Sequence, residues 1–258
     1  MSRKTLMKKF IDAYREYRAA KAKSKAYKIA RYAFFLIAAA FVFLLVYPQV
    51  LFAHEVRYKN FTVYSRQPLD QSLYTVLDKV EAQLSASPIN DANVEPKIFL
   101  TGSQKLYSLL SLYIGWNSFG KGYPLLPTNN VFINEADVSR DLVFRKAATG
   151  SQRSLSGVIS HEITHLHIRN RFGYLRNVIV PAWKKEGYAE YVAGGSTLDH
   201  ETGVKLWKAN PNNGTGYQYF KYYLTVKYLL ETDKVSVEDL FNRDIDQEQL
   251  EAKTFSTL

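Results

Sequence analysis

The residues of this chain best suited to chemistry are two histidines four positions apart, His161 and His165, with Glu162 directly after the first. On a helix, side chains four residues apart project from the same face, one turn from each other. Each imidazole can then give one nitrogen to a shared Zn²⁺ ion at about 2.0–2.1 Å, which leaves room for a third protein ligand and a water molecule. The carboxylate of Glu162 can reach that water. The spacing therefore predicts a zinc centre with a water that can be activated.

The surroundings of this motif favour a buried site over two histidines on a helix surface. The apolar residues around it are Leu155, Val158, Ile159, Ile163 and Leu166, a pattern that sets the helix into a core. About twenty residues later a second expected helix begins at Trp183 and carries Glu186 and Glu190 one turn apart. Gly187 would let the backbones of two packed helices approach closely.

The motif His-Glu-x-x-His followed by Trp-x-x-Glu-Gly-x-Ala-Glu-Tyr resembles the gluzincins, the zinc peptidase clan that includes thermolysin and the neutral aminopeptidases. The resemblance is specific for residues 155–191, extends loosely over 97–230, and is strongest to poorly characterised membrane-anchored gluzincin-like proteins of bacteria. It implies an α+β zincin-like domain, with an active-site helix on a small mixed sheet and then a mainly helical subdomain. It also implies Glu186 as the third ligand of one Zn²⁺ per chain. The interval from His165 to Glu186 is longer than in the best-known gluzincins, so we expect an insertion in residues 170–181.

The same resemblance assigns roles to three further residues. Glu162 would be the general base that takes the proton of the zinc-bound water and returns it to the leaving amine. Glu190 would hydrogen-bond the far nitrogen of His161, unless it is only a surface carboxylate. Tyr219 would donate to the oxyanion, because it opens the helix expected beside the site. Packing in the core or on the surface is the alternative for Tyr219 in a chain with 19 tyrosines.

Other zinc clans fit less well. A metzincin needs glycine and histidine where this chain has Ile168 and Arg171, and an aspzincin would depend on Asp199, which has no supporting motif. His167 points roughly 200° round the helix from His165, so we expect it on the surface or behind the ligands. The two remaining histidines are expected to be exposed: His54 and His200.

The formal charge of +10 is concentrated at the N-terminus. Residues 1–31 hold eleven Lys/Arg and two Asp/Glu, a net of +9, while the other 227 residues hold 23 basic and 22 acidic side chains. A groove that follows nucleic-acid phosphates is therefore not expected in the folded domain. The chain has no cysteine, which excludes disulfides, thiolate metal sites and cysteine nucleophiles.

An uncharged apolar segment follows this basic tail. Residues 32–53 would form a helix of roughly 33 Å, enough to cross a bilayer core. A cleaved signal peptide fits less well because Leu51-Phe52-Ala53 is a poor cleavage site, and a buried core helix would have a polar face. We therefore expect a tail at 1–31, a single transmembrane helix at 32–53 and an extracytoplasmic domain at 54–258. The positive charge places the N-terminus in the cytoplasm and the domain outside the inner membrane, in the periplasm.

The basic tail itself has two main interpretations, and a third, in which it binds nucleic acid on the cytoplasmic side, rests on its charge alone. Its Lys and Arg alternate with Leu6, Phe10, Tyr14 and Tyr17 at a spacing close to one helix face, which is typical of a helix on an anionic lipid surface. Alternatively, the tail is a solvated run of charge that only sets the topology.

The elements that must position the motif follow from periodicity and turn residues. Strands are expected at 61–64, 98–101 and 131–134, and helices at 69–86, 103–110, 155–172, 183–193 and 219–230, with loops at 115–130 and 210–216. The strand at 131–134 is either an interior strand or an edge strand that pairs with an extended peptide. The leading hypothesis is a membrane-anchored zinc peptidase that acts on protein or peptide substrates. The alternative is a membrane-anchored binding or scaffold protein that retains a zinc site.

Overall fold

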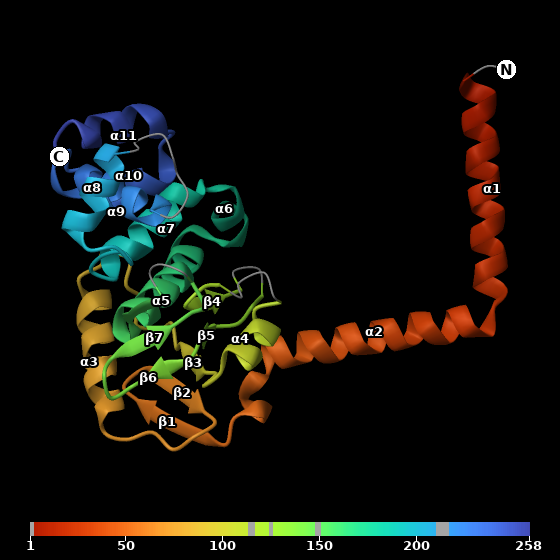
Figure 1. Ribbon diagram of the computed structural model, residues 1–258, viewed down its shortest axis with the longest axis horizontal. Coiled ribbons are helices and arrows are strands. Elements are labelled where there is room, and N and C mark those ends of the chain that lie inside the picture. The colour runs from red at the N-terminus through yellow and green to blue at the C-terminus, as the bar shows by residue number, and fades with distance from the viewer. Residues whose placement is uncertain (1–2, 113–116, 124–125, 148–150, 210–216) are drawn as a thin grey trace. The chain divides into compact units, whose positions relative to one another are not determined.

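The computed structural model describes residues 3–112, 117–123, 126–147, 151–209 and 217–258 (Figure 1). The expected loop at 210–216 lies outside the described residues. The chain divides into two compact units, residues 1–47 and 48–258. The described chain combines helices with a mixed sheet, so it belongs to the α+β class.

The first unit consists of two helices, α1 (Arg3–Lys23) and α2 (Lys25–Val46). Ser24 separates them with an extended backbone (ψ 126°), and its side chain caps the N-terminus of α2. Among the described helices, α2 alone is long and apolar enough to cross a membrane. The expected span at 32–53 differs in its bounds, because the helix starts at Lys25 and ends before Pro48.

The chain after α2 belongs to the folded domain. Pro48–Leu51 forms a short 3₁₀ helix, η1, and the ring of Phe52 lies 5.2 Å from that of Phe99 in the sheet. Proline disfavours a helical conformation in the residue before it, here Tyr47, which caps the C-terminus of α2. The apolar run of the sequence therefore continues past the helix into the domain core.

A five-stranded sheet organises the second unit. Its spatial order is β1 (His54–Tyr58), β2 (Phe61–Ser65), β3 (Lys97–Leu100), β5 (Asn130–Ile133) and β4 (Gly120–Gly122). The pairs β2–β3 and β3–β5 are parallel and the outer pairs are antiparallel. Helix α3 (Ser72–Ser85) connects β2 to β3, and α4 (Gln104–Leu110) follows β3.

The strand order shows which strands lie at the edges of the sheet. β5 is interior, so the edge-strand interpretation of residues 131–134 is wrong, and the edge next to it is β4. β4 lies inside the segment expected to be a loop, residues 115–130. Glycines at both of its ends weaken any strand pattern in the sequence.

The two faces of the sheet bury different side chains. On one face, Val63, Ile98 and Val131 are in register and join a core with α3 and α5 (Leu155–Phe172). On the other face, the rings of Tyr64, Phe99 and Phe132 stack across the strands, with centroids 4.8 and 5.4 Å apart. Such cross-strand aromatic pairs fix the register of the sheet.

A second, antiparallel sheet leads into α5. It contains β6 (Ala136–Asp137), β7 (Leu142–Phe144) and β8 (Gln152–Ser154). The helix N-terminus is capped twice: Ser154 Oγ accepts the N–H of Gly157 at 2.9 Å, and Asp141 accepts the N–H of Ser156 at 2.7 Å. Gly173, with φ 84°, ends the helix.

Helices complete the domain after α5. They are α6 (Tyr174–Ile179), α7 (Ala182–Val192), α8 (His200–Ala209), α9 (Gln218–Glu231), α10 (Val237–Asn242) and α11 (Gln247–Phe255). The residues expected to absorb an insertion, 170–181, contain helix α6. α7 packs tightly on α9, since a Cβ at Gly187 would lie 2.7 Å from Val226 Cγ2. This confirms that Gly187 allows two helices to approach closely.

Candidate metal centre

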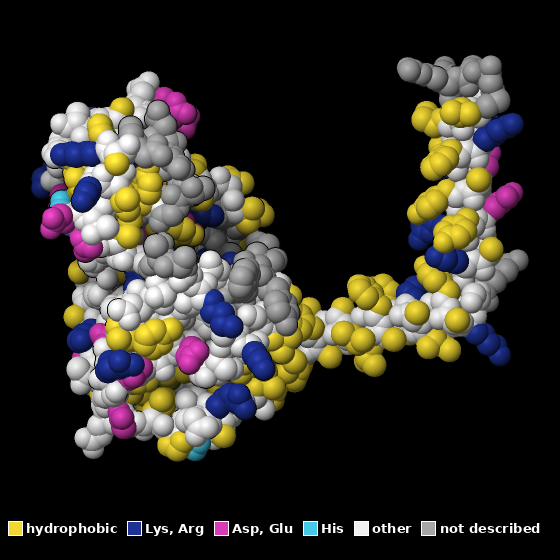
Figure 2. All heavy atoms as spheres, viewed as in Figure 1, with side chains coloured by type: hydrophobic (Ala, Val, Ile, Leu, Met, Phe, Trp, Pro, Cys, Tyr) yellow, Lys and Arg dark blue, Asp and Glu magenta, His cyan; other side chains and the backbone are white. Residues whose placement is uncertain are grey.

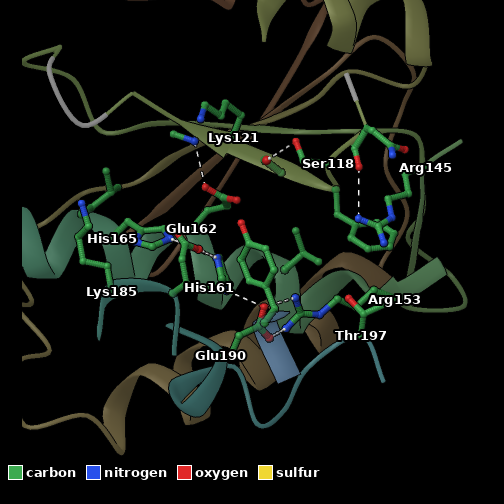
Figure 3. A pocket seen from close by; sticks show the side chains of 18 of the residues that line it. Ser118, Lys121, Arg145, Arg153, His161, Glu162, His165, Lys185, Glu190 and Thr197 are labelled. Atoms are coloured by element: carbon green, nitrogen blue, oxygen red, sulfur yellow. Dashed lines mark hydrogen bonds and ion pairs between the residues drawn. The ribbon is translucent and has the colours of Figure 1, made fainter. Parts of the chain in front are cut away.

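Helices α5 and α7 bring three candidate metal ligands together. His161 and His165 project from one face of α5, and Glu186 faces them from α7 (Figure 3 labels both histidines). The Nε2 atoms of the histidines are 3.1 Å apart, and Glu186 Oε2 lies 3.3 Å from the first and 3.4 Å from the second. Ligands bound tetrahedrally at about 2.0–2.1 Å are about 3.3–3.4 Å from one another. The donor triangle therefore has the size that a single tetrahedral Zn²⁺ requires.

The electrostatics of this triangle favour positive charge. Burial lowers the pKa of His161, but the carboxylates of Glu190 and Glu186 outweigh it and raise that pKa to about 10. Burial opposes ionisation of Glu186, yet the adjacent His165 and His161 hold the pKa of its carboxyl well below its usual value. A cation at this point is thus stabilised by two carboxylates and two imidazoles. The donor set also has the chemistry of a zinc site.

A buried carboxylate orients the first histidine. Glu190 is 1% exposed, and its Oε1 lies 3.3 Å from His161 Nδ1, which has no hydrogen bond of good geometry among the described residues. Figure 3 shows Glu190 between His161 and Arg153. This position rules out the surface interpretation of Glu190. A carboxylate behind a histidine ligand fixes the tautomer and the orientation of the ring.

Arg153 neutralises Glu190 and was not found from the sequence. Its Nη1 donates to Glu190 Oε1 at 2.8 Å, its Nη2 pairs with Oε2, and Nη2 also donates to the carbonyl of Gly195 at 2.8 Å. Burial raises the pKa of Glu190, but Arg153 and His161 outweigh it and lower that pKa. The sequence offers only a basic residue two positions before the motif helix, and a single residue forms no pattern.

The carboxylate of Glu162 is held by the edge strand. Its Oε2 accepts the N–H of Gly122 at 2.9 Å, and the residue is 8% exposed. Gly120 lies even closer: a Cβ there would be 2.7 Å from Glu162 Cγ and 2.9 Å from its Oε1. β4 thus approaches α5 so closely that only glycine fits at position 120.

The strand that contacts Glu162 is itself fixed by a buried network. Ser118 Oγ donates to the carbonyl of Gly120 at 3.0 Å and lies 2.5 Å from the hydroxyl of Tyr107, which is fully buried. Asn134 Nδ2 donates to the carbonyl of Ser118 at 3.0 Å. The position of Glu162 therefore depends on β4, β5 and α4 as well as on its own helix.

A cavity of about 470 Å³ opens over this site. It is lined by the triad, by Glu162 and by β4 with Lys121. Arg145, Lys185, Thr197 and Tyr219 also line it. Lys121 comes from the segment expected to be a loop, residues 115–130, and Thr197 from the chain after Gly195. The volume is within the usual range for ligand sites.

Tyr219 reaches this cavity from the first turn of α9 and is 48% exposed. The charge of Glu186, then burial and the charge of Glu162, raise the pKa of its phenol. The hydroxyl is therefore protonated at neutral pH and able to donate a hydrogen bond. Its placement is compatible with the expected contact to an oxyanion.

The remaining histidines lie away from the triad. His167 is 2% exposed, so a surface position is wrong; it lines a separate hollow with Asp91 and Asn170, and burial lowers its pKa to about 4. His200 is exposed as expected, whereas His54 is half-buried at the start of β1. Sequence periodicity alone did not show that α5 is enclosed on nearly all sides.

No protein-family model matches this chain, and no curated protein resembles it closely enough to count as a relative.

Proposed function

We propose that this protein is a membrane-anchored zinc peptidase of the gluzincin type. The observation that carries the proposal is the triangle of donor atoms from His161, His165 and Glu186, 3.1–3.4 Å apart, with Glu162 beside it on the same helix. The arrangement of the elements supports a zincin domain: the motif helix α5 packs on a mixed sheet, and α7, which carries Glu186, follows it in the chain.

The chain supplies each group that amide hydrolysis needs. Zn²⁺, when bound, supplies an activated water and polarises the scissile carbonyl. Glu162 takes the proton of that water and returns it to the leaving amine, a role suited to a carboxylate held in place by Gly122. Tyr219 donates a hydrogen bond from its hydroxyl to the oxyanion and keeps its proton. Glu190 and Arg153 keep His161 in the tautomer whose Nε2 is free for the metal.

The substrate is a protein or peptide outside the cytoplasmic membrane. α2 anchors the enzyme as a single-pass helix, and the eleven basic residues within 1–31 keep the N-terminus in the cytoplasm. Residues 48–258 are then extracytoplasmic. The cavity takes an extended peptide beside the edge strand β4, whose backbone groups lie next to Glu162.

Two variants of the full chain in detergent separate metal binding from catalysis. Glu186→Ala should lose the single bound zinc, and Glu162→Gln should retain zinc, keep its fold and lose cleavage of a peptide library. Glu201→Ala, an exposed residue at the start of α8, is the matched control and should change neither property. Peptide cleavage that survives in Glu162→Gln would exclude Glu162 as the base. Wild-type protein that binds zinc but cleaves no peptide would favour the scaffold hypothesis.

A further inference from the structure

The helix α1 has an apolar face that the other described residues of its own unit leave uncovered. At about 100° per residue, six apolar side chains fall within an arc of roughly 140°. They are Leu6, Met7, Phe10, Ile11, Tyr14 and Tyr17, and all are exposed, Phe10 by 77%. We call this set the apolar arc. Exposed apolar area of this extent on one helix indicates a surface that binds something.

The charged residues of α1 are sorted around the apolar arc. Asp12 and Glu16 lie on the side of the helix opposite to it, together with Lys9. Arg18 lies just inside its border, and Arg15 and Lys8 lie about 40–60° beyond that border. Figure 2 shows apolar side chains along one side of this helix and acidic ones on the other. A partner that touches the apolar arc therefore meets basic side chains and avoids the acidic ones.

Two basic side chains extend along aromatic rings of the apolar arc. Lys21 Nζ lies 4.6 Å from the ring centre of Tyr17, and the guanidinium of Arg18 lies 5.9 Å from that of Tyr14. Long basic side chains behave in this way at an interface between apolar and charged surroundings, where the stem is buried and the charge is kept at the surface. A duplex nucleic acid would need a contiguous basic face, and here the apolar arc takes that place.

The connection to α2 identifies the partner. One residue separates the end of α1 from α2, the helix able to cross a bilayer, so the C-terminal end of α1 lies where that helix would reach the membrane surface. The extended backbone at Ser24 lets the two helix axes differ in direction, as Figure 1 shows for this unit. Lys25, Lys28 and Arg31, in the first two turns of α2, add positive charge next to the end of α1.

We propose that α1 lies in the headgroup layer of an anionic lipid bilayer, with the apolar arc towards the acyl chains and Asp12 and Glu16 towards water. The partner is an anionic bilayer surface, recognised by shape and charge together. This role is independent of peptidase activity. It gives the N-terminal segment a function beyond setting the topology.

Because the chain has no cysteine, single spin labels can measure the orientation of α1 in the full protein. Labels are placed on Phe10→Cys and Tyr14→Cys within the apolar arc, and on Asp12→Cys and Glu16→Cys opposite to it. The protein is reconstituted into vesicles of phosphatidylcholine with one third phosphatidylglycerol. We expect the ratio of oxygen to aqueous nickel-chelate accessibility to be about tenfold higher at 10 and 14 than at 12 and 16. Equal ratios at the four positions would overturn the proposal.

Two further arms test the charge and the class of partner. In vesicles of phosphatidylcholine alone, or after Lys8→Gln, Arg15→Gln and Arg18→Gln together, the contrast should fall to near unity. The control variant Asp12→Asn with Glu16→Gln should retain the contrast, read at label position 10 against the exposed Ala19→Cys, which lies opposite the apolar arc. Contrast that is unchanged without anionic lipid would contradict recognition by charge. Shielding of positions 10 and 14 by duplex DNA and not by vesicles would assign the face to nucleic acid.

Discussion

Replacing Gly120 by alanine would test whether strand β4 positions the carboxylate of Glu162. The added Cβ would lie 2.7 Å from Glu162 Cγ, 2.9 Å from its Oε1 and 3.0 Å from Val158 Cγ1. Carbon atoms in contact are normally about 3.5–4.0 Å apart, so Glu162 or the strand must move by about 1 Å. A displacement of that size at a catalytic group costs about 10²-fold in rate, or about 2.7 kcal/mol.

Gly122 provides the matched control on the same strand. A Cβ there would lie 3.7 Å from Glu162 Oε2, an ordinary contact, so Gly122→Ala should leave kcat/KM within a few-fold of wild type. Both variants should bind zinc like wild type, because neither glycine touches His161, His165 or Glu186. The assay is kcat/KM on a peptide found by library cleavage, with zinc content measured in parallel. Equal rates for the two variants would refute the positioning role of β4, and loss of zinc only in Gly120→Ala would assign its effect to the metal site.

Four other predictions follow from the packing and charges around the site. Gly187→Ala should destabilise the fold by about 2 kcal/mol or more, because the new Cβ would overlap with α9. Thermal unfolding measures this, and an unchanged unfolding midpoint would contradict the close packing of α7 on α9. Arg153→Met should weaken zinc binding by about 10–100-fold and destabilise the protein by about 3–5 kcal/mol, because the buried Glu190 loses its two hydrogen bonds from arginine and keeps only His161 as a partner. Zinc titration and chemical denaturation together check this. Zinc binding at pH 7.5 should release about one proton, because the pKa of His161 is raised to about 10 and the metal requires the neutral ring; calorimetry in buffers of different ionisation enthalpy detects it. In the metal-free protein, that raised pKa contributes stability that is complete below about pH 6.5 and lost as the pH rises through about 10, and a flat pH profile of the unfolding free energy would exclude it.

The parts of the site that the sequence predicted are those set by local geometry. His161 and His165 share a face because a helix brings residues four apart together, and this requires no knowledge of the remaining fold. The motif helix and the glutamate helix carry apolar residues at helical spacing, so both were found with nearly correct bounds. The apolar segment near the N-terminus was recognised from composition, although Pro48 ends its helix earlier than the apolar run suggests.

The parts that were missed depend on contacts between distant segments. Gly120-Lys121-Gly122 has a composition typical of a loop, and it becomes a strand only because β5 is available as a partner and α5 leaves no space for a side chain. Arg153 could be linked to Glu190 only once β8 and α7 are known to be neighbours. The periodicity of α7 left Glu190 equally suited to solvent, and burial by the surrounding elements decided otherwise.

The hydrogen bonds of Arg153 to Glu190 and to the carbonyl of Gly195 hold together the part of the cavity wall that lies behind His161, here called the floor. They join β8 to α7 and to Gly195, three residues after the end of α7, so β8 and α7 cannot separate without breaking a buried charge pair. Any opening of the cavity for a long substrate must therefore come from its other walls. Those walls are β4, held through Ser118, and the start of α9 with Tyr219. The floor of the cavity, with the three proposed metal ligands, is expected to stay rigid while the rim adjusts.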